Sequence, residues 1–184
     1  MTTASAPSVP LAPSAIQQVW AALEQVPDPE IPVLSIRELG ILRGVQELDG
    51  VLEVVITPTY SGCPAIGQIE DDVRAALAAA GLVARIRTQL APPWTTDWIT
   101  PAARDKLHAY GIAPPHAAYA TLPVGANVIS FAPKKIATQQ ALMPTCPRCD
   151  SKNVTETSHF GSTACKALYK CLDCLEPFDY FKPY

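Results

Sequence analysis

Apolar residues near the start of the chain recur at the spacing of one helical face: Ile16, Val19, Trp20 and Leu23. This spacing predicts a helix that begins near Ser14, whose side chain can cap the first turn. The helix must end before residues 27–32, because three prolines in these six positions exclude helical backbone. The prolines predict a stiff, ordered loop in which side chains can be held in place.

Two runs rich in β-branched and other apolar residues follow, at 41–48 and 51–57, and each predicts a strand. The pair Asp49-Gly50 stands between them. This dipeptide is typical of the two-residue turn of a hairpin, because both positions tolerate a left-handed backbone. The sequence therefore predicts two antiparallel strands.

A helix is expected over residues 64–80, with Pro64 at its first position and Gly81 as its stop. Residues 83–90 predict a third strand. The fold class is therefore α+β, with a small mixed sheet, helices packed on it and a C-terminal four-cysteine ribbon described below.

A further helix is predicted over residues 101–110, with Gly111 as its C-terminal cap. We expect the first domain to span residues 14–111. Three other parts complete the predicted organisation: a flexible arm at 1–13, a proline-rich connector at 112–143 and a ribbon at 144–184. The arm contains no Lys or Arg and no continuous apolar run, so neither an export signal nor a membrane span is expected.

Two C-x-x-C pairs lie in the predicted ribbon: Cys146, Cys149, Cys171 and Cys174. Four thiolates in two such pairs satisfy a tetrahedral metal, and the residues between them can form a hairpin. A segment of about forty residues buries too little apolar surface to fold unaided, so a metal would hold it together. Zinc is the predicted ion, with iron in the same sulfur set as the alternative.

Cys165 and His159 lie between the two pairs and receive no role, since four cysteines already fill a tetrahedral shell. The ribbon residues carry equal numbers of basic and acidic side chains. The whole chain has a net charge of −3. This balance argues against nucleic acid as a partner. Six cysteines without an export signal predict a cytoplasmic protein with reduced thiols.

Cys63 follows a predicted strand and directly precedes a predicted helix. Helix N-termini favour the thiolate, which is both the nucleophile and the metal ligand, so this position predicts a functional thiol with a lowered pKa. A lone cysteine that fills space in the core is the alternative, and the spacing alone does not decide between the two.

Asp28 and Glu30 lie in the proline-stiffened loop and could supply oxygen ligands beside Cys63. Alternatively, Asp28 caps a turn and Glu30 is solvated. No phosphate-binding loop, dinucleotide-binding glycine motif, nucleophile elbow or histidine metal motif is present in the sequence. Catalytic residues are therefore not predicted. A thiol-dependent activity of Cys63 is the least favoured class, because it requires a base that the sequence does not identify.

Residues 28–40, which begin Asp28-Pro29-Glu30, and residues 57–64, which end in Cys63-Pro64, resemble the two motifs of a known domain. It is shared by bacterial SufT and the eukaryotic targeting factors of cytosolic iron–sulfur assembly. The whole chain, through segments 93–100 and 161–171, is similar to a phenylacetate-degradation family. That family is encoded with the subunits of phenylacetyl-CoA epoxidase.

This resemblance implies an accessory factor that matures iron–sulfur clusters for the epoxidase system. The client that it implies is the [2Fe–2S] reductase component, and the iron–sulfur assembly machinery is the other implied partner. The functional cysteine of the domain falls on Cys63, and its acidic motif falls on Asp28 and Glu30. Leu175 stands where a glycine is common in such ribbons.

Three mechanisms remain open for the predicted thiol site. A cluster needs about four protein ligands. Two protomers could therefore share a transient iron or cluster through paired Cys63 thiols, as a homodimer. Alternatively, the domain is an adaptor that holds no cluster, which we favour slightly. A third alternative is a zinc-ribbon interaction module or an assembly subunit of the epoxidase without iron chemistry.

Overall fold

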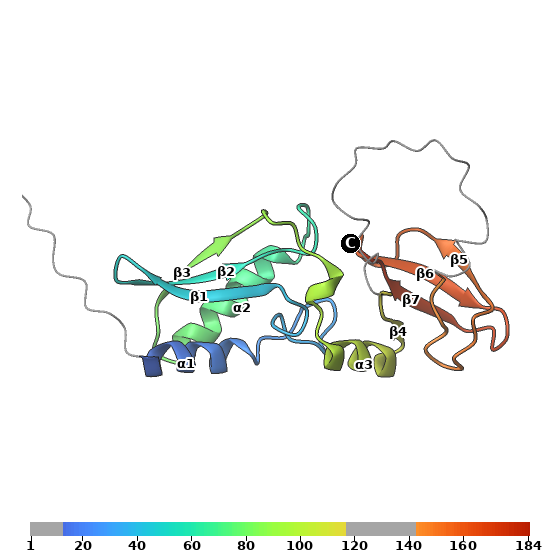
Figure 1. Ribbon diagram of the computed structural model, residues 1–184, viewed down its shortest axis with the longest axis horizontal. Helices are drawn as coiled ribbons and strands as arrows, with labels where there is room; N and C mark the ends of the chain where they lie inside the picture. Colours follow the sequence, from blue (N-terminus) through green and yellow to red (C-terminus); the bar gives the residue numbers. More distant parts are fainter. Residues whose placement is uncertain (1–12, 117–142) are drawn as a thin grey trace, which may run out of the picture. The chain divides into compact units, whose positions relative to one another are not determined.

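The computed structural model describes residues 13–116 and 143–184 (Figure 1). They fall into two compact units, one ending at Trp94 and the other beginning at Thr95. The predicted arm, apart from Pro13, and most of the predicted connector lie outside the described residues. No helix among the described residues is long and apolar enough to cross a membrane.

The N-terminal unit has the predicted α+β architecture, with two helices and a three-stranded sheet. Its elements are α1 (Pro13–Leu23), β1 (Leu42–Leu48), β2 (Val51–Ile56), α2 (Ile66–Ala79) and β3 (Ala84–Thr88). The sheet order is β1-β2-β3, in which β1 and β2 are antiparallel while β2 and β3 are parallel. The parallel pair requires a crossover, which α2 supplies, and both helices lie on one face of the sheet (Figure 1).

The core of this unit lies between the helices and the central strand β2. Leu52, Val54 and Ile56 alternate along β2 and are at most 4 % exposed. Glu53 points to the opposite face and is nevertheless buried. Its carboxylate accepts hydrogen bonds from Arg87 and Gln46, and these bonds lower the pKa of Glu53. A buried acid is tolerated here because it is paired.

The hairpin turn and the start of α2 show where the sequence predictions hold and where they fail. Asp49 and Gly50 both have positive φ angles, 54° and 75°, as the predicted turn requires.

However, α2 begins at Ile66, two residues later than expected. Two successive turns stand before the helix instead: the Cys63 amide donates to the Tyr60 carbonyl at 3.1 Å, and the Ile66 amide donates to the Cys63 carbonyl at 3.4 Å. Cys63 therefore precedes the helix rather than adjoining its first turn.

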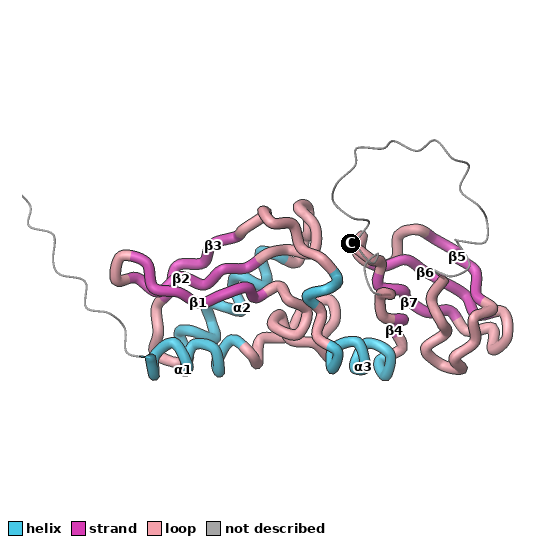
Figure 2. Tube along the Cα trace, in the orientation of Figure 1, coloured by secondary structure: helices cyan, strands magenta, loops and turns pink. Residues whose placement is uncertain are grey.

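The C-terminal unit contains a short 3₁₀ helix, one α-helix and a four-stranded sheet. Its elements are η1 (Thr96–Trp98), α3 (Pro101–Tyr110), β4 (Ile112–Ala113), β5 (Val154–Ser158), β6 (Lys166–Cys171) and β7 (Pro177–Phe181). The sheet order is β4-β7-β6-β5. The strand β4 is parallel to β7, while β6 is antiparallel to both of its neighbours. Figure 2 distinguishes these strands from the loops that connect them. Cys171 is the last residue of β6, whereas Cys146, Cys149 and Cys174 lie in loops.

Residues 95–116 pack with the ribbon rather than with the first sheet. Ile112 pairs with Asp179 across β4 and β7. Arg104 of α3 donates to the carbonyls of Thr96 and Pro115, which ties the helix to this unit. These contacts group α3 with the C-terminal unit, whereas the sequence prediction assigned residues up to 111 to the first domain. Sequence order alone could not show this, because β4 and β7 lie more than sixty residues apart.

Candidate metal centre and thiol site

The structure brings the four ribbon cysteines together. The ligand atoms of Cys146, Cys149, Cys171 and Cys174 all lie within 4.8 Å of one another. Two sulfur pairs connect the knuckles: Cys146 to Cys174 at 3.7 Å and Cys149 to Cys171 at 3.6 Å. A tetrahedral ion with metal–sulfur bonds near 2.3 Å would separate its ligands by about 3.8 Å. The donor set and its spacing therefore suit a tetrahedral metal ion.

Each C-x-x-C knuckle closes through the residue after its second cysteine. Asp150 and Leu175 occupy these positions and have left-handed φ angles of 56° and 64°. The turn lets backbone groups hydrogen-bond within each knuckle, such as the Cys171 amide to the Glu176 carbonyl at 3.0 Å. Leu175 holds this conformation without the freedom of glycine, so the second knuckle carries backbone strain.

A polar clasp of three residues, Ser151, Asn153 and Asp173, joins the two knuckles. The Asp173 carboxylate accepts from the Ser151 hydroxyl at 2.5 Å and from the Asn153 amide at 2.7 Å. The Leu172 backbone amide also donates to the Asn153 carbonyl at 2.8 Å. Because Asp173 lies between Cys171 and Cys174, the clasp fixes one cysteine pair against the other.

The backbone around the second knuckle favours a charged sulfur. The Cys174 amide donates to the sulfur of Cys171 at 3.5 Å and lowers the pKa of the Cys171 thiol to about 7, whereas burial and the neighbouring sulfurs raise the pKa of the Cys149 and Cys174 thiols. A thiol that loses its proton near neutral pH is ready to ligate a cation. Cys171 and Cys146 are buried, whereas Cys149 is exposed, so the ion site lies at the edge of the core.

Cys165 and His159 do not join the four-cysteine group. Cys165 is buried, and its sulfur lies 3.0 Å from the Thr163 hydroxyl. His159 contacts the Glu156 carboxylate at 3.3 Å. The sequence analysis left both residues unassigned, and neither is a ligand in this arrangement.

Cys63 lies partly buried in the turn before α2, where two donors face its sulfur. The Ala65 amide and the Thr59 hydroxyl both donate to it, which favours the thiolate. Burial acts in the opposite direction and is the largest influence, and the charges of Glu30 and Asp28 add to it. The pKa of Cys63 is therefore raised. The prediction of a lowered pKa is wrong, because burial and two carboxylates outweigh the donors.

The structure thus brings Asp28 and Glu30 close enough to Cys63 for their charges to act on it. Asp28 is also buried and accepts from the amides of Glu30 and Ile31 at 2.9 and 2.8 Å. Its carboxylate therefore caps the proline-rich turn, as the simpler alternative proposed, and at the same time faces the thiol. The two interpretations of Asp28 are compatible.

Asp28, Glu30 and Cys63 do not form a preformed ion site. Among the residues that the structure describes, the four cysteines are the one group of at least three ligand atoms close enough to hold one ion. A negative environment without a closed ligand set can attract a cation but does not bind it as a resident cofactor. This geometry fits transient contact better than storage of a metal.

Sequence reasoning missed Thr59 and the interknuckle clasp. Thr59 lies within the same motif as Cys63, four residues before it, so its position in a tight turn was a usable signal. The clasp had no such signal, because Ser151 and Asp173 are separated by twenty-two residues and meet only when both knuckles fold.

Comparison with known proteins assigns a family to each part of the chain. Residues 16–87 match the iron–sulfur cluster assembly protein family, and residues 130–182 match the PaaD zinc β-ribbon domain. The class of protein is therefore an iron–sulfur assembly-type domain joined to a zinc ribbon. The chain belongs to the PaaD family.

Two relatives illustrate the match. A protein of Escherichia coli (strain K12), provisionally named as a subunit of 1,2-phenylacetyl-CoA epoxidase, is 45 % identical over 94 % of this chain and 95 % of its own length. The Fe-S protein maturation auxiliary factor YitW of Bacillus subtilis (strain 168) is 38 % identical over 44 % of this chain and 81 % of its own. The resemblance noted from the sequence motifs is confirmed.

Replacing Leu175 by glycine should stabilise the C-terminal unit by about 0.5–1 kcal/mol, because glycine adopts the left-handed backbone without strain. Little packing is lost, since Leu175 is 63 % exposed. Hydrogen exchange of the metal-loaded full chain measures the effect. The matched control is Leu172→Gly, at an exposed knuckle position without positive φ, which should be destabilising. Equal effects of the two substitutions would contradict this account of the turn.

Removing the clasp should loosen metal binding. Asp173→Ala is expected to weaken Zn²⁺ affinity by about tenfold, the usual scale for residues that orient ligands. Competition with a chromophoric chelator measures the loss on the full chain. Glu176→Ala, an exposed acid in the same turn, is the control and should retain its affinity. If both variants lose zinc equally, charge rather than the clasp explains the result.

Cys63 should react slowly with iodoacetamide at pH 7, because its raised pKa keeps it protonated. Glu30→Gln should lower that pKa and speed alkylation at neutral pH, while burial still holds the rate below that of an unfolded cysteine. Peptide-level mass spectrometry across pH separates Cys63 from the other thiols. Glu47→Gln, at the hairpin end of β1, serves as the control. An unchanged Cys63 rate in Glu30→Gln would refute the role of that carboxylate.

Proposed function

We propose that the chain is an accessory maturation factor that supports iron–sulfur cluster insertion in a phenylacetyl-CoA epoxidase system. The observation that carries this proposal is the union, in one chain, of an iron–sulfur assembly-type domain and a PaaD zinc ribbon. A relative of nearly full coverage bears the name of an epoxidase subunit, and another is named a maturation auxiliary factor. The chain therefore acts as a subunit or accessory of that complex rather than as the oxygenase.

The [2Fe–2S] reductase component is the client that we infer. Aerobic oxygenation needs electrons, and a reductase that lacks its cluster would stop their flow to the oxygenase. The second partner is the iron–sulfur assembly machinery, from which a cluster or iron would come. In this scheme the cluster is cargo, and the four ribbon cysteines are not among its ligands.

The ribbon holds a structural ion, for which we propose zinc. Four sulfur donors at tetrahedral spacing suit zinc, which has no redox chemistry and supplies folding energy to small ribbons. The same donor set accepts iron, so metal analysis of protein from its native host decides between them.

In the N-terminal unit, Cys63 is the proposed functional thiol, with Asp28 and Glu30 as its supporting residues. Its protonated state at neutral pH disfavours permanent metal binding, while the nearby carboxylates favour the approach of a cation. An arriving iron ion would displace the thiol proton and be held only briefly, because no closed ligand set is present in the described residues. We therefore favour an adaptor that binds iron only transiently and holds no cluster. The alternative is a homodimer that stores a cluster between its two chains.

A second candidate function is an interaction adaptor without iron chemistry, in a cytoplasmic complex. The exposed aromatic side chains Phe160 and Tyr184 favour it, because Tyr and Phe are enriched in protein interfaces. In that case Cys63 would be dispensable, and only the surface of the ribbon would matter.

The two candidates are separated by the cluster content of the reductase. A strain lacking this gene is complemented with the wild-type chain, Cys63→Ala or Cys165→Ala, and the reductase is purified from each. Iron, acid-labile sulfide and flavin are then measured per polypeptide. We expect Cys63→Ala to give reductase with retained flavin and about tenfold less iron and sulfide than wild type, a loss typical of removing one essential chemical group.

Cys165→Ala is the matched control, since Cys165 lies outside both sites, and it should restore normal iron and sulfide. Normal cluster content with Cys63→Ala would support the adaptor function without iron chemistry. Normal content in the deletion strain itself would overturn the maturation function for this client.

A further inference from the structure

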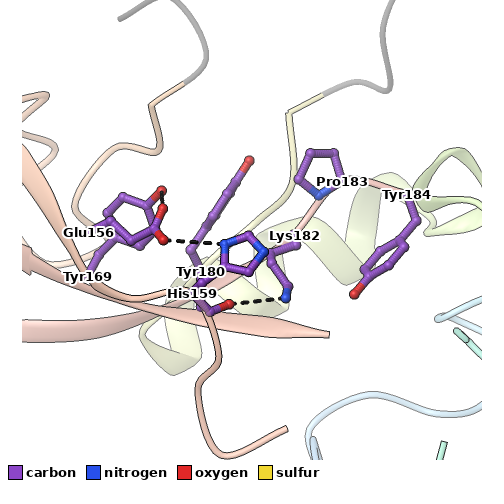
Figure 3. Close-up of a pocket in the computed structure, with 8 residues that line it drawn as sticks. Glu156, His159, Tyr169, Tyr180, Lys182, Pro183 and Tyr184 are labelled. Atoms are coloured by element: carbon purple, nitrogen blue, oxygen red, sulfur yellow. Dashed lines mark hydrogen bonds and ion pairs between the residues drawn. The ribbon is translucent and has the colours of Figure 1, made fainter. Parts of the chain in front are cut away.

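A cavity of about 320 Å³ opens on the sheet of the C-terminal unit, and none of the four ribbon cysteines is among its lining residues (Figure 3). Glu156 and Tyr169 stand on one side of it and Pro183 and Tyr184 on the other, with His159 and Lys182 between them. Its size is at the lower end of ligand-binding cavities, so it could accept one or two side chains.

The base of the cavity is aromatic and fixed. Tyr169 and Tyr180 are 6 % and 5 % exposed, and their rings meet edge to face with centroids 5.5 Å apart. The Tyr169 hydroxyl donates to the Glu156 carboxylate at 3.0 Å. The base therefore offers rigid, flat surfaces of the kind that bind apolar side chains.

Among the polar side chains that line the cavity, the ammonium group of Lys182 can bind an incoming anion. The Glu156 carboxylate is engaged by Tyr169 and lies 3.3 Å from His159. Lys182 donates to the His159 carbonyl at 3.1 Å and lies 4.5 Å from the centre of the Phe160 ring. The charge of Glu156 also acts on Lys182, but its carboxylate is held by the Tyr169 hydroxyl, while the Lys182 ammonium donates its hydrogen bond to the His159 carbonyl. An ammonium group has three donors, so Lys182 can still bind an incoming carboxylate.

The neighbouring strand favours a peptide as the occupant. In the sheet order β4-β7-β6-β5, β5 is an edge strand, and no strand of the described residues pairs with its outer side. Glu156 belongs to β5 and lines the cavity. An extended segment beside β5 could therefore form main-chain hydrogen bonds while its side chains reach the cavity.

We propose that this cavity docks an extended segment of a partner protein. The segment places a large apolar side chain against Tyr169 and Tyr180, and an adjacent carboxylate on Lys182. The identity of the partner as a maturation client rests on the proposed function. Docking itself is measured without any client, so a failure of docking and a failure of cluster maturation remain distinguishable.

The test is an NMR titration of the isotope-labelled, zinc-loaded full chain with capped peptides of sequence Gly-Thr-Phe-Asp-Thr-Gly. Two matched peptides replace the aspartate by lysine or the phenylalanine by alanine. The expected result is saturable shifts at Tyr169, Tyr180 and Lys182 with a dissociation constant of about 1 mM, weak as befits a short flexible peptide. Both altered peptides should bind about tenfold more weakly.

Lys182→Glu and Lys182→Gln test the cation. Both should weaken binding, the first by about tenfold, because a like charge then faces the peptide carboxylate. Lys170→Glu, an exposed lysine of β6, is the matched control and should change affinity by less than about twofold. Preserved spectra away from the cavity show that each variant is folded.

Three results would overturn the proposal. One is the absence of shifts at the cavity. Another is equal binding of all three peptides, and a third is equal weakening by the substitutions at Lys182 and Lys170. Stronger binding of free 3-phenylpropanoate than of the peptide would instead assign the cavity to a small aromatic acid, and would also reject a docking site for protein.

Discussion

Four cysteine sulfurs within 4.8 Å of one another constrain the C-terminal unit, because they come from two knuckles separated by more than twenty residues. Without a cation, four thiols at this spacing would gain little from their proximity, and thiolates would repel each other. A tetrahedral ion would turn this repulsion into attraction. It would join the two knuckles next to the core of the unit, and the hydrogen bonds of Asp173 to Ser151 and Asn153 would keep the knuckles aligned.

The N-terminal unit differs from the C-terminal unit in what surrounds its cysteine. Its core includes buried apolar side chains of α1, β2 and α2, and Asp28 and Cys63 lie on loops beside this core. Asp28 is anchored by two backbone amides, and Cys63 by the turn before α2. Burial and negative charge keep this thiol protonated at rest. The role proposed for Cys63 is brief contact with iron, whereas the closed set of four sulfurs in the ribbon suits a resident ion.

The sequence predicted local features well and long-range ones poorly. The hairpin at Asp49-Gly50, the capped helix ending at Gly111 and the grouping of the ribbon cysteines depend on short motifs, and the structure contains each of them. The association of β4 with β7 depends on pairing between distant strands, which spacing does not encode. The pKa of Cys63 was predicted in the wrong direction, because burial raises it most and the charges of Glu30 and Asp28, from another loop, raise it further. The functional role of Cys63 stays a prediction.

The central claim is that one bound ion holds the C-terminal unit while the N-terminal unit folds without it. Hydrogen exchange of the full chain, measured with zinc bound and after chelation, tests this claim directly. The account predicts that amides of β5, β6 and β7 lose protection on chelation, while those of β1, β2 and α2 keep it. Unchanged protection of β5–β7 in the metal-free chain would contradict it.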